Sequence, residues 1–231
     1  MRFTEMIFRA RTGALFLAAI VASGCASSSA KPAEEVTVAV SPLTGMIGRQ
    51  VLVLPSQLIS TALPGGGSEV RPGEASLLKL LDQEITDAFR KRGIRGNWTF
   101  AEDIVASAAR NGGLAGDPLG LPVAGIRRVK AGDTPLPEPL ASNIRTLVSL
   151  TSARYVVLPL EAKVDMTGGQ RKGSLRVLLI DARTARVLWA ADVEGQSSRD
   201  PAVVSEAMSP FGFRIIAREI AGAFADMVVA Q

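Results

Sequence analysis

The side chains that could carry out chemistry in this chain are limited by two counts: it has one cysteine, Cys25, and no histidine. Histidine is the usual general base near neutral pH and the commonest metal ligand. Its absence excludes a Ser-His-Asp or Cys-His catalytic site and a zinc site built from cysteine and histidine. A single thiol cannot form an intramolecular disulfide, so the fold must depend on packing.

Cys25 directly follows an N-terminal segment that has three parts. Residues 1–12 (MRFTEMIFRART) are net basic, and residues 13–24 (GALFLAAIVASG) are apolar and end in small residues. A basic start, a short apolar run and small residues before a cleavage site are typical of a secretory signal. The apolar run is too short to cross a hydrocarbon layer of about 30 Å at about 1.5 Å per helical residue. We therefore expect a removable signal, with a permanent transmembrane helix as the alternative.

The residues around the cysteine, Ala22-Ser23-Gly24-Cys25, resemble the lipobox of bacterial lipoproteins. In that family a leucine usually stands where this chain has Ala22, and here Val21 supplies a bulky side chain one place earlier. The resemblance implies that Cys25 receives a diacylglycerol thioether and becomes the first residue of the mature protein. Two or three acyl chains give a stable membrane anchor, whereas one gives marginal binding. The alternative is an unmodified, buried cysteine behind an ordinary signal.

The segment after the cysteine divides the anchor from the folded part. Residues 26–35 (ASSSAKPAEE) are small and polar without an apolar period, which predicts a flexible tether. We expect a signal peptide at 1–24, the lipidated cysteine and its tether at 25–48, and a single globular domain at 49–231. Ala26 stands where an aspartate would mark inner-membrane retention in enterobacterial lipoproteins, so the resemblance implies the periplasmic face of the outer membrane.

Carboxylates are the other candidates for catalysis. Four of them lie near strand ends or turns, and no two have a spacing that requires a shared active site: Glu161, Asp165, Asp181 and Glu194. We expect ordinary solvent-facing carboxylates. The glycines at 65–67 lack the GK[ST] pattern and do not directly follow a strand, so no phosphate-cradling loop is predicted. The sequence predicts no enzyme, no cofactor and no metal.

The charge of the chain does not indicate a nucleic-acid-binding protein. The formal net charge is +4, and the first 24 residues carry half of it, with three arginines and one glutamate. A nucleic-acid binder usually has a clustered basic stripe. The densest basic runs are FRKRG (89–93) and GIRRVK (125–130). We expect a solvated helix end and a solvated loop, with contact to anionic lipid or glycan as the alternative.

Strand and helix patterns alternate from residue 49 onward. Strands are predicted at 49–55, 93–100, 154–165, 174–182 and 186–195. Helices are predicted at 74–93, 101–111, 139–153 and about 211–229, the last behind Ser209-Pro210, with a short helix behind Asp200-Pro201. This order predicts an α/β (α+β) fold, in which helices pack on a mixed sheet of about five strands. The sheet ends in an antiparallel three-strand meander, followed by a long C-terminal helix.

Two segments give more specific expectations. In the strand at 154–165, the apolar residues at alternate positions are expected to share one face: Val156, Leu158, Leu160, Ala162 and Val164. Glu161, Lys163 and Asp165 would then meet water. The segment 114–139 is a long Gly/Pro-rich loop with several apolar residues. Loops of this length are uncommon in compact domains. It is expected either to fold over part of the core or to contact a partner.

The predicted order and its local sequence resemble the anticodon-binding-like α/β fold of several exported bacterial proteins. These are the amino-terminal domain of the translocation protein TolB, the curli secretion lipoprotein CsgG, and lipoproteins that activate peptidoglycan synthases. The matching segments are 51–55, 152–164, 175–195 and the closing helix. In these relatives a glycine commonly stands where this chain has Ala185. The resemblance implies a fold and no active site, and a fold alone does not determine function.

The function that these observations favour is a lipid-anchored, non-enzymatic binding or assembly module. It would be held at the membrane by its anchor and meet an unidentified envelope protein through a sheet edge or the 114–139 loop. The alternative is a subunit of a homo-oligomeric, CsgG-like outer-membrane secretion complex. A pore would need hairpin strands with strict alternation. The pairs Leu178-Leu179 and Ala190-Ala191 break that alternation.

Overall fold

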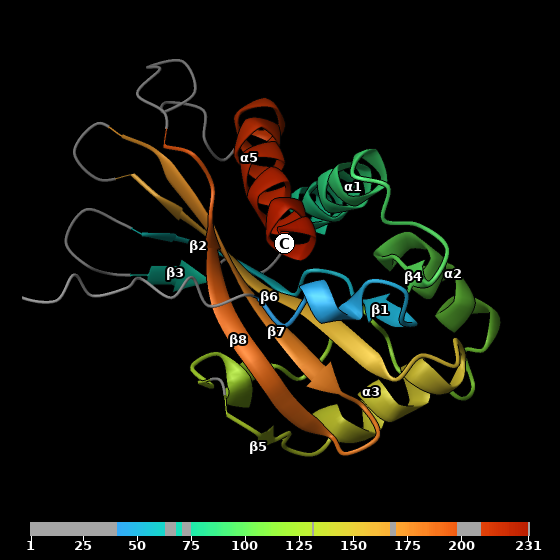
Figure 1. Ribbon diagram of the computed structural model, residues 1–231. Coiled ribbons are helices and arrows are strands. Elements are labelled where there is room, and N and C mark those ends of the chain that lie inside the picture. Colours follow the sequence, from blue (N-terminus) through green and yellow to red (C-terminus); the bar gives the residue numbers. More distant parts are fainter. Residues whose placement is uncertain are drawn as a thin grey trace, which may run out of the picture. The chain divides into compact units, whose positions relative to one another are not determined.

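A mixed β-sheet with helices packed on it forms the described part of the chain (Figure 1). The computed structural model describes residues 41–62, 68–70, 75–130, 132–166, 170–197 and 209–230. The strands are β1 (Val51–Val53), β2 (Leu58–Ala62), β3 (Ser68–Val70), β4 (Trp98–Thr99), β5 (Thr134–Pro135), β6 (Tyr155–Asp165), β7 (Lys172–Asp181) and β8 (Arg186–Glu194). The helices are α1 (Ala75–Lys91), α2 (Ala101–Arg110), α3 (Leu140–Ser149) and α5 (Pro210–Val229), with short 3-10 turns η1 (Thr44–Met46) and η2 (Ala124–Ile126).

Strand β6 lies at the centre of this sheet. Along one edge it pairs antiparallel with β7, and β7 pairs antiparallel with β8, which gives the predicted three-strand meander. Along the other edge, β1 pairs parallel with the first half of β6, and β2 pairs parallel with the second half. β4 extends β1, β3 extends β2, and β5 borders the outer side of β8.

The expected α/β fold is confirmed. The five predicted strands are present as β1, β4, β6, β7 and β8, and the four long helices are present as α1, α2, α3 and α5. The structure adds β2, β3 and β5, which the sequence did not predict. The predicted short helix behind Asp200-Pro201 lies outside the described residues.

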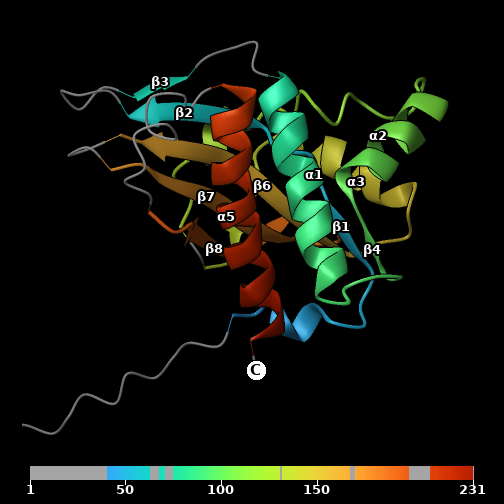
Figure 2. The same cartoon turned by 90° about the horizontal axis from the view of Figure 1, so that it is seen from above.

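Helices α1 and α5 lie side by side on one face of the sheet (Figure 2). Their shared core includes an aromatic cluster, in which the ring of Phe89 lies 5.4 Å from Trp98 and 5.0 Å from Phe224. Such pairs add stability beyond the apolar area that they bury. Helix α5 begins as expected, because the side chain of Ser209 accepts a hydrogen bond of 3.1 Å from the backbone N–H of Gly212.

The close approach of α5 to β7 depends on Gly173. A Cβ atom at this position would lie 2.3 Å from Cγ2 of Ile216, which is fully buried. Arg171, also fully buried, donates from Nη1 to the carbonyl oxygen of Gly212 at 3.2 Å and pairs with Glu219 at 3.3 Å. α5 can therefore lie close to β7 because Gly173 has no side chain, and the buried Arg171 holds it there.

A register shift between Pro159 and Glu161 changes which face the side chains of β6 meet. Val156 and Leu158, before the shift, and Leu160, the inserted residue, pack in the core beside α3. After the shift, Ala162 and Val164 pack in the opposite core, beneath α1 and α5. The prediction that all five residues share one face is therefore wrong. An extra residue in one strand of a pair reverses the alternation beyond it, and Pro159 suits such a position because it has no N–H to donate.

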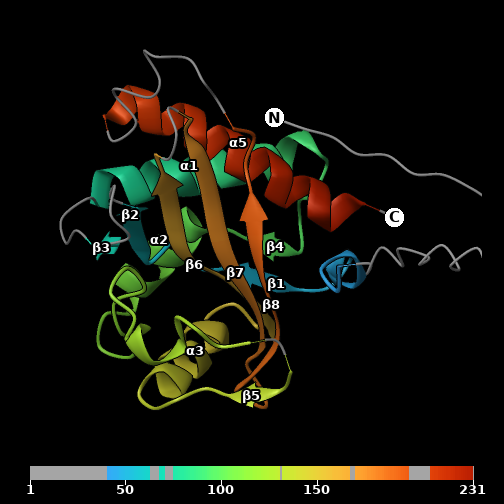
Figure 3. The same ribbon diagram turned by 90° about the vertical axis from the view of Figure 1, so that its left-hand side faces the viewer.

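The segment 114–139 folds over the second face of the sheet together with α3 (Figure 3). Its residues Leu121, Val123, Ile126 and Leu136 are buried in the core, so the first of the two expectations is confirmed. Gln57 ties the segment to the sheet. Its side-chain amide donates to the carbonyl oxygen of Pro118 at 3.0 Å, and its side-chain oxygen accepts from the N–H of Leu121 at 2.9 Å.

The compact unit begins before the predicted start of the domain at Arg49. The described residues 41–48 belong to it, and Leu43 is fully buried in the core beneath α1 and α5. The last residues of the predicted tether, from 41 onward, are therefore part of the domain. The physical reason is that a single buried leucine orders the segment around it, and the polar composition at 26–35 gives no sign of this.

The turn between β7 and β8 places Ala185 in the left-handed region, at φ 53°. A side chain in that conformation costs about 1–2 kcal/mol. A glycine at this position would adopt the same conformation without that cost. Asp181 stabilises the turn, because its Oδ1 accepts a hydrogen bond of 2.9 Å from the N–H of Arg183.

Asp82 is a buried carboxylate on α1 that holds the connection between β1 and β2. Its Oδ1 accepts hydrogen bonds from the backbone N–H of Ser56 at 2.9 Å and from the Ser56 hydroxyl at 2.7 Å. Burial raises the pKa of Asp82 from 3.8 to about 6, although the hydrogen bonds from Ser56 lower it in part. The folded chain thus binds this proton more tightly than the unfolded chain does. The contribution of Asp82 to stability is fully present below pH 3.8 and is lost as the pH rises through about 6.

Replacing Asp82 with asparagine should stabilise the protein at pH 8. Asparagine keeps an oxygen that accepts both bonds from Ser56 but carries no charge, so the gain in unfolding free energy should be at most about 3 kcal/mol. Urea unfolding at pH 8 and pH 3 measures the difference in unfolding free energy between the variant and the wild type. This difference should vanish at pH 3. Asp87→Asn, on the exposed side of the same helix, is the control. An equal gain at both pH values would contradict the interpretation.

Candidate functional site

The residues predicted to form the lipid attachment site lie outside the described residues. These are Cys25 and the lipobox residues Ala22, Ser23 and Gly24. Among the residues that the structure does describe, no helix has both the length and the apolar character needed to cross a membrane. Within the same ranges, no group of acidic or cysteine side chains is placed to hold a metal ion.

The four carboxylates singled out from the sequence do not come together. Asp181 lies at the turn between β7 and β8, and Glu194 lies at the far end of β8. Glu194 pairs with Lys172 at 2.7 Å. The expectation that all four face solvent is wrong for two of them, because Asp181 and Glu161 are only 4% and 2% exposed.

Asp181 can be buried because hydrogen bonds within the protein replace the ones that its carboxylate would make to water. Besides the turn N–H groups, it accepts hydrogen bonds from Nε and Nη2 of Arg154 at 3.1 and 2.7 Å. Burial alone would raise the pKa of Asp181, but the bonds from Arg154, Arg183 and Thr184 outweigh it and lower the pKa. Its role is therefore to hold the hairpin turn.

Glu161 is the buried carboxylate of a polar recess beside the second half of β6. Its Oε1 accepts a hydrogen bond of 2.8 Å from the hydroxyl of Ser60 on β2. The guanidinium of Arg127, which follows η2, holds both of its oxygens, with Nη2 at 2.5 Å from Oε1 and Nε at 3.2 Å from Oε2. The pair is therefore bidentate, the strongest arrangement of an arginine and a carboxylate.

The register shift in β6 explains why Glu161 faces this recess. Beyond the shift, Glu161 and Lys163 lie on the side of the sheet that carries α3, in a part that α3 does not cover. Burial alone would raise the pKa of Glu161. The hydrogen bonds from Arg127 and Ser60 and the charges of Arg127 and Lys163 outweigh it, so the pKa lies below its ordinary value.

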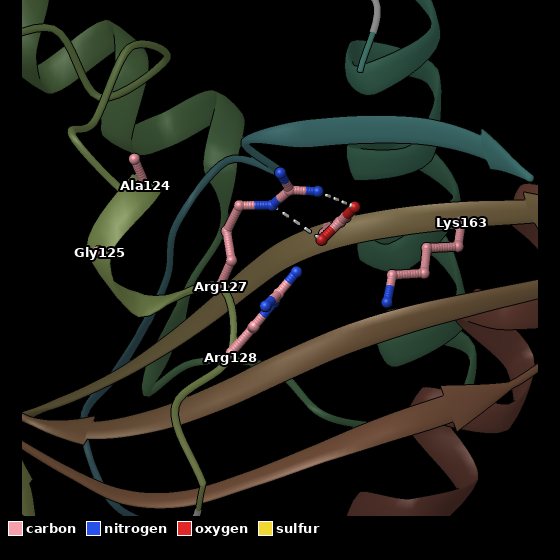
Figure 4. A pocket seen from close by; sticks show the side chains of 6 residues that line it. Ala124, Gly125, Arg127, Arg128 and Lys163 are labelled. Carbon is pink, nitrogen blue, oxygen red and sulfur yellow. Dashed lines mark hydrogen bonds and ion pairs between the residues drawn. The ribbon is translucent and has the colours of Figure 1, made fainter. Parts of the chain in front are cut away.

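The recess has a volume of about 500 Å³ and is lined by Ala124, Gly125, Arg127, Arg128, Glu161 and Lys163. Figure 4 shows Arg127 and Arg128 entering from the segment after η2, and Lys163 entering from β6. The basic run at 125–130, expected to be a solvated loop, thus includes one arginine that pairs with a buried acid. No local sequence pattern indicated this pair, since Arg127 and Glu161 are 34 residues apart.

A second exposed feature is the outer edge of β8. β5 pairs with β8 only at Arg186 and Val187. Among the described residues, no strand pairs with the outer edge from Leu188 to Glu194. The side of the molecule drawn in Figure 3 shows β8 at this edge. Apolar side chains are also exposed in the 114–139 segment, where Leu114 is 76% and Leu119 is 54% exposed.

Replacing Arg127 with alanine should destabilise the protein because it leaves Glu161 buried without its counter-ion. Since water reaches the recess, we expect a loss of about 2–3 kcal/mol of unfolding free energy at pH 7, below the usual cost of breaking a fully buried pair. The loss of unfolding free energy should shrink at pH 4, because in the variant Glu161 has no counter-ion and takes up a proton there. In the wild type, the contribution of Glu161 to the unfolding free energy is fully present above the ordinary pKa of a glutamate. It is lost as the pH falls through the lowered pKa of Glu161.

Denaturant unfolding at both pH values measures this difference. Arg128→Ala is the matched control, because Arg128 has no ion pair among the described residues, and it should change stability by less than about 0.5 kcal/mol. A loss that is the same at pH 4 and pH 7 would show that packing, and not charge, accounts for the effect of Arg127.

No family model and no curated protein matches this sequence. Several solved structures are similar to it. One is the LpoB C-terminal domain from Salmonella enterica, with a TM-score of 0.31 and 12% identity over 68% of this chain and 95% of that chain. Another is lipoprotein GNA1162 from Neisseria meningitidis, with a TM-score of 0.35 and 13% identity over 72% of this chain and 97% of that chain. A third is the PelC dodecamer from Paraburkholderia phytofirmans, with a TM-score of 0.30 and 13% identity over 79% and 89% of the two chains. Similarity at this level assigns neither a function nor a partner to this chain.

Proposed function

We propose that this protein is a lipid-anchored, non-enzymatic binding or assembly module of the Gram-negative cell envelope. Cys25 is its lipid attachment site, behind the signal peptide at 1–24, and the domain stands on the periplasmic face of the outer membrane. The observation that carries the proposal is the sequence Ala22-Ser23-Gly24-Cys25 directly after a short apolar run. The resemblance to the TolB amino-terminal domain and to CsgG belongs to the same proposal.

The domain acts through contacts with another envelope protein. The free edge of β8 supports this role, because its unpaired N–H and C=O groups are a template for an added strand. Leu188, which is 39% exposed, and the partly buried Trp189 lie on this edge. The exposed Leu114 and Leu119 offer a second, apolar contact.

The anchor can be tested by replacing Cys25 with serine, which removes the thiol and keeps a side chain of similar size. We expect the variant to lose its acyl chains and to leave the outer-membrane fraction, as a soluble or an unprocessed form. Membrane fractionation and the intact mass of the purified protein measure both effects. If the variant fractionates with the outer membrane like the wild type, the lipoprotein proposal is wrong.

The second candidate function is a subunit of an oligomeric, CsgG-like secretion complex, which the free edge of β8 also favours, since a second copy could extend the sheet there. Light scattering of the lipidated protein in mild detergent separates the two candidates. We expect the mass of a monomer or dimer. A discrete, ring-sized oligomer would contradict the binding module and favour the secretion complex.

A further inference from the structure

Two exposed cations, Arg128 and Lys163, line the recess beside Glu161, and neither has a carboxylate within ion-pair distance among the described residues. Figure 4 shows the side chains of Arg128 and Lys163 reaching toward the same space, one from the segment after η2 and one from β6. Both residues are exposed, and neither has an ion pair or a side-chain hydrogen bond among the described residues. Like charges directed at one space repel, and an anion between them removes that repulsion.

The acids nearby are already engaged. Both oxygens of Glu161 are held by Arg127, and Ser60 adds a third bond. On the same side of the sheet, Asp192 pairs with Arg176 at 2.9 Å, and Glu194 pairs with Lys172. Asp165 lies two residues beyond Lys163 on β6 and also has an interaction of its own. The side chains that line the recess therefore carry three positive charges and one negative charge.

We propose that this recess binds a phosphate group between Arg128 and Lys163. A guanidinium presents two parallel N–H donors that match phosphate oxygens, and an ammonium adds a compact charge. The pair of Arg127 and Glu161 forms a fixed wall, because the carboxylate is buried and accepts hydrogen bonds from β2 and from the segment after η2. The volume of about 500 Å³ is within the usual range for small-ligand sites.

The phosphate group can belong to a soluble compound or to the headgroup of an anionic phospholipid. This inference goes beyond the proposed function, since it concerns a different surface from the free edge of β8. It holds whether or not that edge binds a protein.

Calorimetric titration of the mature, lipidated protein in mild detergent tests the site. The probes are inorganic pyrophosphate and short-chain phosphatidylglycerol, with short-chain phosphatidylcholine as the control lipid. We expect saturable binding of at least one anionic probe. Binding of pyrophosphate indicates a soluble ligand, and binding of phosphatidylglycerol alone indicates a lipid headgroup.

Variants locate the site. Arg128→Gln and Lys163→Gln should each weaken the binding at least about tenfold, because each removes a charge-assisted hydrogen bond. The matched control is Lys130→Gln, which removes one positive charge from an exposed residue that does not line the recess. The proposal is overturned if no anionic probe binds saturably, or if the Arg128→Gln/Lys163→Gln double variant binds like the wild type. An equal loss in Lys130→Gln would also overturn it, by showing a general effect of net charge.

Discussion

The register shift in the middle of β6 is the constraint on which the rest of the domain depends. Because of it, residues at alternate positions along one strand face different cores: Val156 and Leu158 the core beside α3, Ala162 and Val164 the core beneath α1 and α5. The pairing along one edge of β6 is divided in the same way, since β1 pairs with the first half of β6 and β2 with the second half. Without the shift, Ala162 and Val164 would leave the core beneath α5 and Glu161 would enter it.

The polar surfaces follow from this arrangement. Because the second half of β6 is turned over, the side of the sheet that α3 leaves uncovered receives charged residues, and a buried carboxylate there needs a cation. Arg127 supplies it from the segment that folds over the sheet, so one ion pair connects the loop to the central strand. The opposite face is covered by α1 and α5, and Gly173 lets α5 approach closely.

The sequence predicted the regular elements well, because apolar periodicity records which residues each element buries. Five strands and four long helices were found in this way. Strand β2 was missed because Leu58–Ala62 is short and carries Ser60 and Thr61, and it exists only beside the second half of β6. The faces of β6 were misassigned because one inserted residue reverses an alternation that otherwise looks regular. The recess was missed because Arg127 and Glu161 are far apart in the sequence, and no local pattern records such a partnership.

The parallel pairing of β1 and β2 with β6 also has a consequence for how the chain folds. Ser60 and Glu161, which touch in the folded domain, are 101 residues apart in the sequence. Contacts of such long range form slowly, since the chain must close a large loop before they stabilise it. β1 can pair with β4 and β2 with β3 early in the chain, but neither can join the central sheet until β6 is present. A chain with this topology completes its sheet late, because both parallel neighbours of the central strand must wait for residues 155–165.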